Sequence, residues 1–153
     1  MLDKTLTEFL EQGLAIHLGT RNNAMRPNGC RVTAVRVEDE GRHLVCFVPS
    51  AVSPAVLDDL RVSGQAAVSF ARPTDDRAVQ VKGDVLSVRD ADPAEESFVL
   101  GQWQGLLTEL DVIGLRPLTS TSTWLMWPCL AITIRVTEIF SQTPGPEAGA
   151  VLA

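Results

Sequence analysis

Tyrosine is absent from this chain of 153 residues, and aromatic residues make up only 5% of it. The absence of tyrosine excludes catalysis by a tyrosine acid or radical. Only three cysteines occur, Cys30, Cys46 and Cys129. They are too few and too scattered for a disulfide framework or a zinc cluster. We therefore expect reduced, mostly packed thiols in a cytoplasmic protein.

Long apolar runs are also lacking, because the longest are far shorter than a transmembrane helix requires. The first twelve residues, MLDKTLTEFLEQ, are acidic and amphipathic, unlike a signal peptide. The net charge of −6 disfavours non-specific binding to nucleic acid or to anionic membranes. We expect neither of these partners, and one domain that folds without disulfides or metals.

Familiar catalytic motifs are missing as well. The chain has no nucleophile elbow, no Walker-type loop and no GxGxxG after a strand. The two histidines, His17 and His43, lack the spacing of metal ligands, so we interpret them as surface or hydrogen-bonded residues and expect no metal site. The acidic pairs are best explained as solvated or capping carboxylates: Asp58–Asp59, Asp75–Asp76 and Glu95–Glu96.

The hydrophobic pattern predicts a strand-rich chain. Alternation of apolar residues indicates strands over residues 14–20, 30–37, 43–49, 65–72, 77–89 and part of 124–140. Caps and stops predict a short helix from Thr5, a helix over Ser50 to Gly64 with Ser53 as its N-cap, and a helix from Asp92 to near Gly114. We predict an α+β class dominated by β, an antiparallel barrel of about six strands and three helices over residues 1–143. A mobile Pro/Gly-rich tail is predicted over residues 144–153.

Two of these strands, 30–37 and 43–49, are joined by a short loop with one glycine, which predicts an antiparallel hairpin. Arg31 and Arg36 lie inside the first of them. Guanidinium groups among apolar residues need water, a carboxylate or an anionic ligand. One interpretation is that they form surface ion pairs with Glu38, Asp39 or Asp84. The other is that they hold an anion together with the backbone amides of the helix that begins at Ser53.

The residues from about 14 to 89 resemble the pyridoxamine 5'-phosphate oxidase-like FMN-binding split-barrel family, and the likeness continues more weakly to the end. RVTAVR, residues 31–36, resembles the strand in which two cations contact the flavin phosphate and ring edge. FVPSAVSPAVLDDL, residues 47–60, matches the strand and helix that wrap the phosphate, and RAVQVKG, residues 77–83, the strand that faces the flavin. The resemblance implies an antiparallel split β-barrel, a homodimer, FMN as cofactor and an oxidoreductase acting on an unidentified small molecule.

The resemblance also implies a set of FMN-binding residues: Arg31, Val32, Thr33, Ala34, Arg36, Val48, Pro49, Ser50, Ser53 and Gln80. It assigns no catalytic residue. Pro54 and Ala55 replace two basic residues of the family, and Ala78 replaces a glutamine for which Gln80 is a partial substitute. Losing two charged contacts would weaken phosphate binding about a hundredfold. The alternatives are a non-catalytic split-barrel dimer with a degenerate flavin site, or a binder of deazaflavin or haem.

Overall fold

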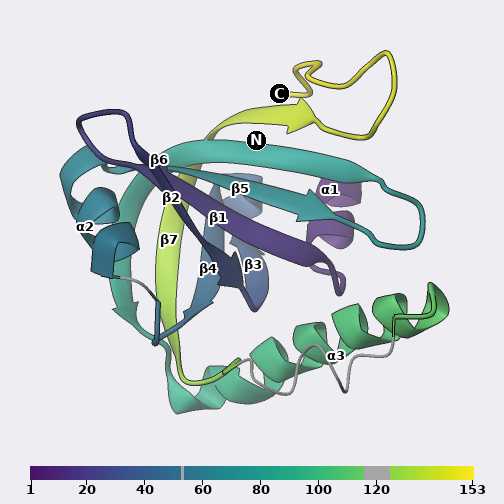
Figure 1. Cartoon of the computed structure of the whole chain (residues 1–153), viewed down its shortest axis with the longest axis horizontal. Coiled ribbons are helices and arrows are strands. Elements are labelled where there is room, and N and C mark those ends of the chain that lie inside the picture. Colours follow the sequence, from purple (N-terminus) through teal and green to yellow (C-terminus); the bar gives the residue numbers. More distant parts are fainter. Residues whose placement is uncertain (53, 116–124) are drawn as a thin grey trace.

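The computed structural model describes residues 1–52, 54–115 and 125–153 (Figure 1). The described residues form β1 (Ala15–Arg21), β2 (Pro27–Val32), β3 (Ala34–Glu38), β4 (His43–Pro49), β5 (Gln65–Ala71), β6 (Ala78–Asp90) and β7 (Cys129–Ser141). The helices are α1 (Lys4–Leu10), α2 (Pro54–Ser63) and α3 (Glu96–Val112), with 3-10 turns η1 (Asp39–Gly41) and η2 (Pro93–Glu95). This confirms the predicted strand-dominated α+β class, with seven described strands instead of six.

The additional strand arises because the predicted strand 30–37 is two strands, separated by Thr33. All neighbours in the sheet are antiparallel, in the order β2-β1-β5-β6-β7-β4-β3. The predicted hairpin is therefore right for β3 and β4, whereas β2 pairs with β1. Since β2 and β3 form opposite edges of the sheet yet are joined by one residue, the sheet must curl until its edges meet. The result is a split barrel.

The barrel interior holds the main hydrophobic core, and α3 covers a second, smaller cluster outside it. Strand β4 contributes to both. Leu44 and Cys46 point into the barrel, while Val45 and Phe47 point outward to pack with Val99 of α3. Burial on both faces explains why β4 is a nearly continuous apolar run in the sequence.

Helix α3 also satisfies the free edge of β3. The side-chain amide of Gln102 accepts a hydrogen bond from Val35 N–H at 3.0 Å and donates one to Val35 O at 2.6 Å. The Glu11 carboxylate accepts a further bond from Val37 N–H at 2.7 Å. These side chains replace the bonds that a neighbouring strand would make, so the edge is not open to another chain.

The helix starts agree with the sequence in one case and differ in another. Asp92 and Glu95 form the predicted capping box at η2, immediately before α3. The predicted cap Thr5 is wrong, because Asp3 accepts the hydrogen bond from Leu6 N–H at 2.8 Å. An ionised carboxylate makes a stronger cap than a hydroxyl, which favours the earlier start.

The C-terminal residues 142–153 turn back along the end of β7 (Figure 1). They lie beyond Arg135, the last residue of β7 that pairs with β4. Ile139 donates its N–H to Ala153 O at 2.8 Å and accepts from Leu152 N–H at 2.7 Å. Most of these tail side chains are exposed. The domain boundary at residue 143 and the mobility of the tail stay predictions.

Glu95 joins three elements at the base of α3. Its carboxylate accepts hydrogen bonds from Arg89 at 2.9 Å, from Arg36 at 2.8 Å and from Asp92 N–H at 2.9 Å. The Arg89 guanidinium, assisted by that of Arg36, lowers the pKa of Glu95 to about 2. The ionised form therefore stabilises the folded chain by linking β3, β6 and the helix start.

We predict that Glu95→Gln lowers the free energy of unfolding by roughly 2 kcal/mol at pH 7, the scale of lost charged hydrogen bonds. The folded pKa of Glu95 is depressed, so its contribution is complete above about pH 4.5 and is lost as the pH falls toward about 2. Urea unfolding at several pH values should show the wild-type advantage shrinking over that range. Glu147→Gln, on the exposed tail, is the control and should change little.

Candidate functional site

The outer face of the sheet over β2, β1, β5 and β6 carries the candidate site. Residues that pair across neighbouring strands point to the same face, so the register defines rows of side chains. One outward row holds, in strand order, Arg31, His17, Ser69 and Gln80. The next outward row holds Gly29, Gly19, Ala67 and Lys82. Three of the four strands contribute almost no side chain to this second row, so the face is hollowed there.

A hollow of about 430 Å³ lies over these rows, and we call it the Arg31 hollow. Its volume is within the range of small-molecule sites. Its lining comprises His17, Leu18, Gly19, Gly29, Cys30, Arg31, Ala67, Ser69 and Gln80. The Gln80 amide donates a hydrogen bond to the Ser69 hydroxyl at 3.3 Å. A guanidinium, an imidazole, a hydroxyl and an amide therefore meet on a floor of small residues.

The Arg31 hollow is positively charged at neutral pH. Burial lowers the pKa of His17 from its ordinary 6.5, and the positive charge of Arg31 lowers it further, so the imidazole is neutral. Burial also lowers the pKa of Arg31, although a guanidinium stays protonated at neutral pH. Burial raises the pKa of Cys30 to about 11, which keeps it an unreactive thiol. Arg31 is thus the charged side chain of this lining.

The structure brings together two of the residues predicted to bind FMN, Arg31 and Gln80, from β2 and β6. It does not bring Arg36 to them. The Arg36 guanidinium forms ion pairs at 2.8 Å with Glu38 and with Glu95. It also lies 5.4 Å from the ring centre of Phe47. For Arg36 the geometry therefore agrees with the ion-pair interpretation.

Four other residues that were predicted to bind FMN are buried where the barrel closes. Val32 and Val48 belong to the main core, and Ala34 belongs to the cluster beneath α3. Thr33 donates its N–H to Phe47 O at 2.8 Å and its hydroxyl to Met126 O at 3.3 Å. None of these four side chains lines the Arg31 hollow.

The remaining residues that were predicted to bind FMN lie in the segment before α2: Pro49, Ser50 and Ser53. Pro49 is half-buried and pairs with Cys129, while Ser50 is exposed and donates its N–H to Pro128 O at 2.8 Å. Ser53 lies outside the described residues. The binding of an anion at the start of α2 therefore stays a prediction.

Asp59 is a site-supporting residue that the sequence pattern missed. It is only 4% exposed, although the acidic pair suggested a solvated carboxylate. Its carboxylate accepts hydrogen bonds from the Thr20 hydroxyl at 2.8 Å and the Asn28 amide at 2.7 Å. Asp59 thereby fixes α2 to the ends of β1 and β2. His17 and Ser69 were also missed, because only the strand register places them beside Arg31.

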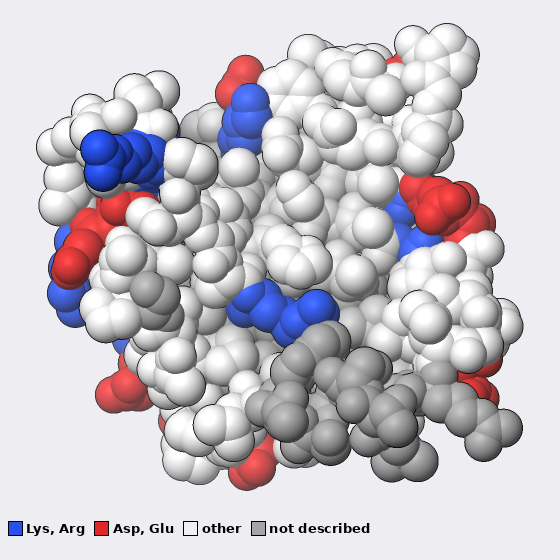
Figure 2. All heavy atoms as spheres, in the orientation of Figure 1, with Lys and Arg blue, Asp and Glu red and all other residues white. Residues whose placement is uncertain are grey.

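Charge is distributed unevenly over this face of the molecule. In Figures 1 and 2, β1, β2 and β6 lie in front, and uncharged atoms cover most of the surface. Lys and Arg atoms lie both near its middle and at its margins, whereas Asp and Glu atoms lie toward its margins. The face is suited to an uncharged or anionic ligand.

Within the described ranges there is no group of three or more potential metal ligands. No helix in these ranges is long and apolar enough to cross a bilayer.

The proximity of His17 and Arg31 can be measured in solution. We predict that the imidazole of His17 titrates below pH 6.5, and that Arg31→Gln raises this pKa part of the way back. Burial is the larger cause, so the pKa should stay below 6.5 in the variant. NMR titration of the histidine side chains measures both values. Arg61→Gln, on the exposed side of α2, should leave the His17 titration unchanged; an unshifted pKa in Arg31→Gln would contradict the geometry.

Among known proteins, only solved structures match this chain, and they identify its fold. No family model and no curated protein sequence matches the chain. An F420 reductase of known structure matches 90% of this chain and 98% of its own, with 18% identity and a TM-score of 0.59. HupZ of Group A Streptococcus matches 97% of this chain and 100% of its own, with 13% identity and a TM-score of 0.58.

Two further similar structures are described as FMN-binding or as a pyridoxamine 5'-phosphate oxidase. An FMN-binding protein from Syntrophomonas wolfei matches 91% of this chain and 87% of its own, with 13% identity and a TM-score of 0.55. A putative pyridoxamine 5'-phosphate oxidase from Lactobacillus delbrueckii matches 91% of this chain and 93% of its own, with 14% identity and a TM-score of 0.56. At these identities the likeness is one of fold. The chain therefore has the split-barrel fold of the pyridoxamine 5'-phosphate oxidase-like, FMN-binding proteins that its sequence resembles.

Proposed function

We propose that this protein binds FMN in the Arg31 hollow and is an oxidoreductase acting on a small molecule. The observation that carries the proposal is the meeting of Arg31 and Gln80 in one positively charged hollow of about 430 Å³. FMN is anionic through its phosphate, and a positively charged concave site favours such a ligand. Solved proteins with the same fold are described as FMN-binding, which supports a flavin-type cofactor.

The lining residues fit a flat, anionic cofactor. Gly19 and Gly29 pair directly and present backbone to the hollow, so a planar ring can approach the strands closely. Arg31 offers charge-assisted hydrogen bonds to a phosphate or to an electron-rich ring edge. Ser69 and Gln80 supply a hydroxyl and an amide that can orient polar ring atoms. A bound flavin would supply the hydride chemistry, while these residues bind and orient it.

Arg36 has no part in this proposal, because Glu38 and Glu95 already neutralise it. Pro54 and Ala55 add no positive charge where the family has basic residues. The phosphate contact therefore depends mainly on Arg31. This single cation explains why we expect weaker binding than in a site with several.

A deazaflavin is the second candidate, because an F420 reductase shares the fold. Haem is a weaker alternative, and it would need His17 or His43 as the axial ligand. A dimer with a degenerate site that binds none of these is the non-catalytic alternative. The absorbance spectrum of the purified protein, before and after each cofactor is added, separates the four.

We predict that the protein takes up FMN at micromolar concentrations and that Arg31→Gln weakens this binding about tenfold, the effect of one charged hydrogen bond. Flavin fluorescence quenching measures the affinity. Arg36→Gln is the matched control: it removes the same charge but should leave FMN affinity unchanged. A colourless protein that takes up no FMN, or equal losses in the two variants, would rule out this site.

We also propose that two copies associate through the hollowed sheet face, where small residues leave room for a partner. Light scattering after size-exclusion chromatography should then give twice the chain mass of 16.5 kDa. Ala67→Glu, in the middle of this face, should shift the protein to a monomer. Ala55→Glu, exposed on α2, is the control and should stay dimeric. A monomeric wild type would refute the dimer.

A further inference from the structure

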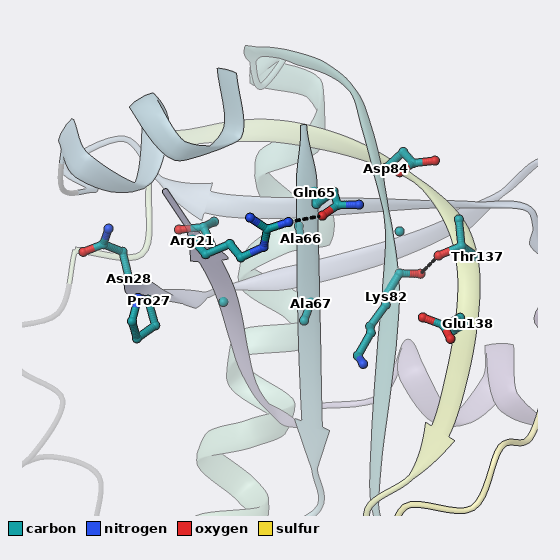
Figure 3. Close-up of a pocket in the computed structure, with 13 residues that line it drawn as sticks. Arg21, Pro27, Asn28, Gln65, Ala66, Ala67, Lys82, Asp84, Thr137 and Glu138 are labelled. Atoms are coloured by element: carbon teal, nitrogen blue, oxygen red, sulfur yellow. Dashed lines mark hydrogen bonds between the residues drawn. The ribbon is translucent and has the colours of Figure 1, made fainter. Parts of the chain in front are cut away.

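A second hollow lies beside the Arg31 hollow on the same face and has a volume of about 470 Å³ (Figure 3). We call it the Arg21 hollow. The two hollows share Gly19 and Ala67 in their linings. Arg21 approaches from β1 and Lys82 from β6, with Ala67 of β5 between them. Two cations on opposite walls of one hollow are a feature that the flavin proposal does not use.

Neither cation has a carboxylate partner in the described part of the chain. Arg21 donates to the neutral Gln65 amide oxygen at 2.8 Å, and the Lys82 ammonium lies 4.5 Å from the ring centre of Phe140. By contrast, six other arginines form ion pairs with acids: Arg36, Arg42, Arg61, Arg72, Arg89 and Arg135. In a chain with a net charge of −6, acids are plentiful. The two positive charges in this hollow are thus left available to an anionic ligand.

The acids that line the hollow do not cancel this charge. Asp84 is engaged at 2.7 Å by Arg135, which compensates its negative charge. Glu138 lies exposed on β7, paired in register with Lys82. Figure 3 shows the Lys82 side chain extending toward the β5 side, away from the Glu138 carboxylate. Two cations therefore face the hollow against one uncompensated acid at its rim.

The spacing of the cations selects the class of ligand. Strands β1 and β6 are separated by β5, which puts their backbones about 10 Å apart. Arg21 extends from β1 to Gln65 on the neighbouring strand β5, so its guanidinium and the Lys82 ammonium lie on different sides of the hollow. A guanidinium can hold a carboxylate with two hydrogen bonds, and an ammonium can hold another as a point charge. A ligand with a carboxylate at each end matches this arrangement better than a single phosphate.

We propose that the Arg21 hollow binds a short dicarboxylate, one carboxylate on Arg21 and the other on Lys82. The binding itself does not require a flavin. Because the hollows share Gly19 and Ala67, a bound dicarboxylate would lie next to a flavin in the Arg31 hollow. Its role as the oxidoreductase substrate is the part that rests on the proposed function.

Isothermal titration of flavin-free protein with succinate tests the site. We expect saturable binding with one succinate per chain, and about tenfold weaker binding in Arg21→Gln and in Lys82→Gln. Acetate, with one carboxylate, should bind at least tenfold more weakly than succinate. Arg61→Gln removes the same charge from α2 and should leave succinate binding unchanged. Circular dichroism confirms that each variant is folded.

The proposal is overturned if succinate shows no saturable binding to the wild type, or if Arg21→Gln and Lys82→Gln bind succinate as tightly as the wild type does. Equal affinity for succinate, acetate and inorganic phosphate would likewise overturn the dicarboxylate assignment. A parallel FMN titration keeps the two proposals separate. Protein that binds succinate but no FMN retains the dicarboxylate site and loses the flavin, and the reverse result retains only the flavin.

Discussion

The closure of the barrel at Thr33 is the constraint on which the rest of the structure depends. This one residue connects the two edge strands of the sheet, and its N–H is satisfied by Phe47 O. Closure fixes which side chains of β2 and β3 face outward, since a slip of one residue would exchange the two faces. It also separates Arg31 from Arg36, which go to different strand partners and different surroundings. The candidate site is therefore a product of the closure.

Electrostatic pairing distinguishes two sets of cations among the described residues. Those at the margins are neutralised locally, as Arg36 and Arg89 are by Glu95. Arg21 and Lys82, over the hollowed face, meet a neutral amide and an aromatic ring. An acidic protein can thus repel anions over most of its surface while keeping a local positive field in one place. Such a field favours specific small anions over long polyanions.

Local patterns predicted much of the fold, and long-range pairing explains what they missed. The hairpin of β3 and β4 and the capping box at Asp92 depend on neighbouring residues and are visible in the sequence. The break at Thr33 and the pairing of Arg36 with Glu95 depend on segments that are distant in the chain. The resemblance to the family predicted Arg31 and Gln80 as binding residues. His17 and Ser69 lie beside them only through the register of the sheet.

The double hydrogen bond between Gln102 and Val35 has a mechanical consequence for α3. It attaches the middle of the helix to the sheet edge, while Val99 packs against β4 and Glu109 accepts a hydrogen bond from the Thr74 hydroxyl at 2.6 Å. Sliding of the helix along the sheet would break both amide bonds and disrupt these other contacts. The helix is therefore held at one position along β3.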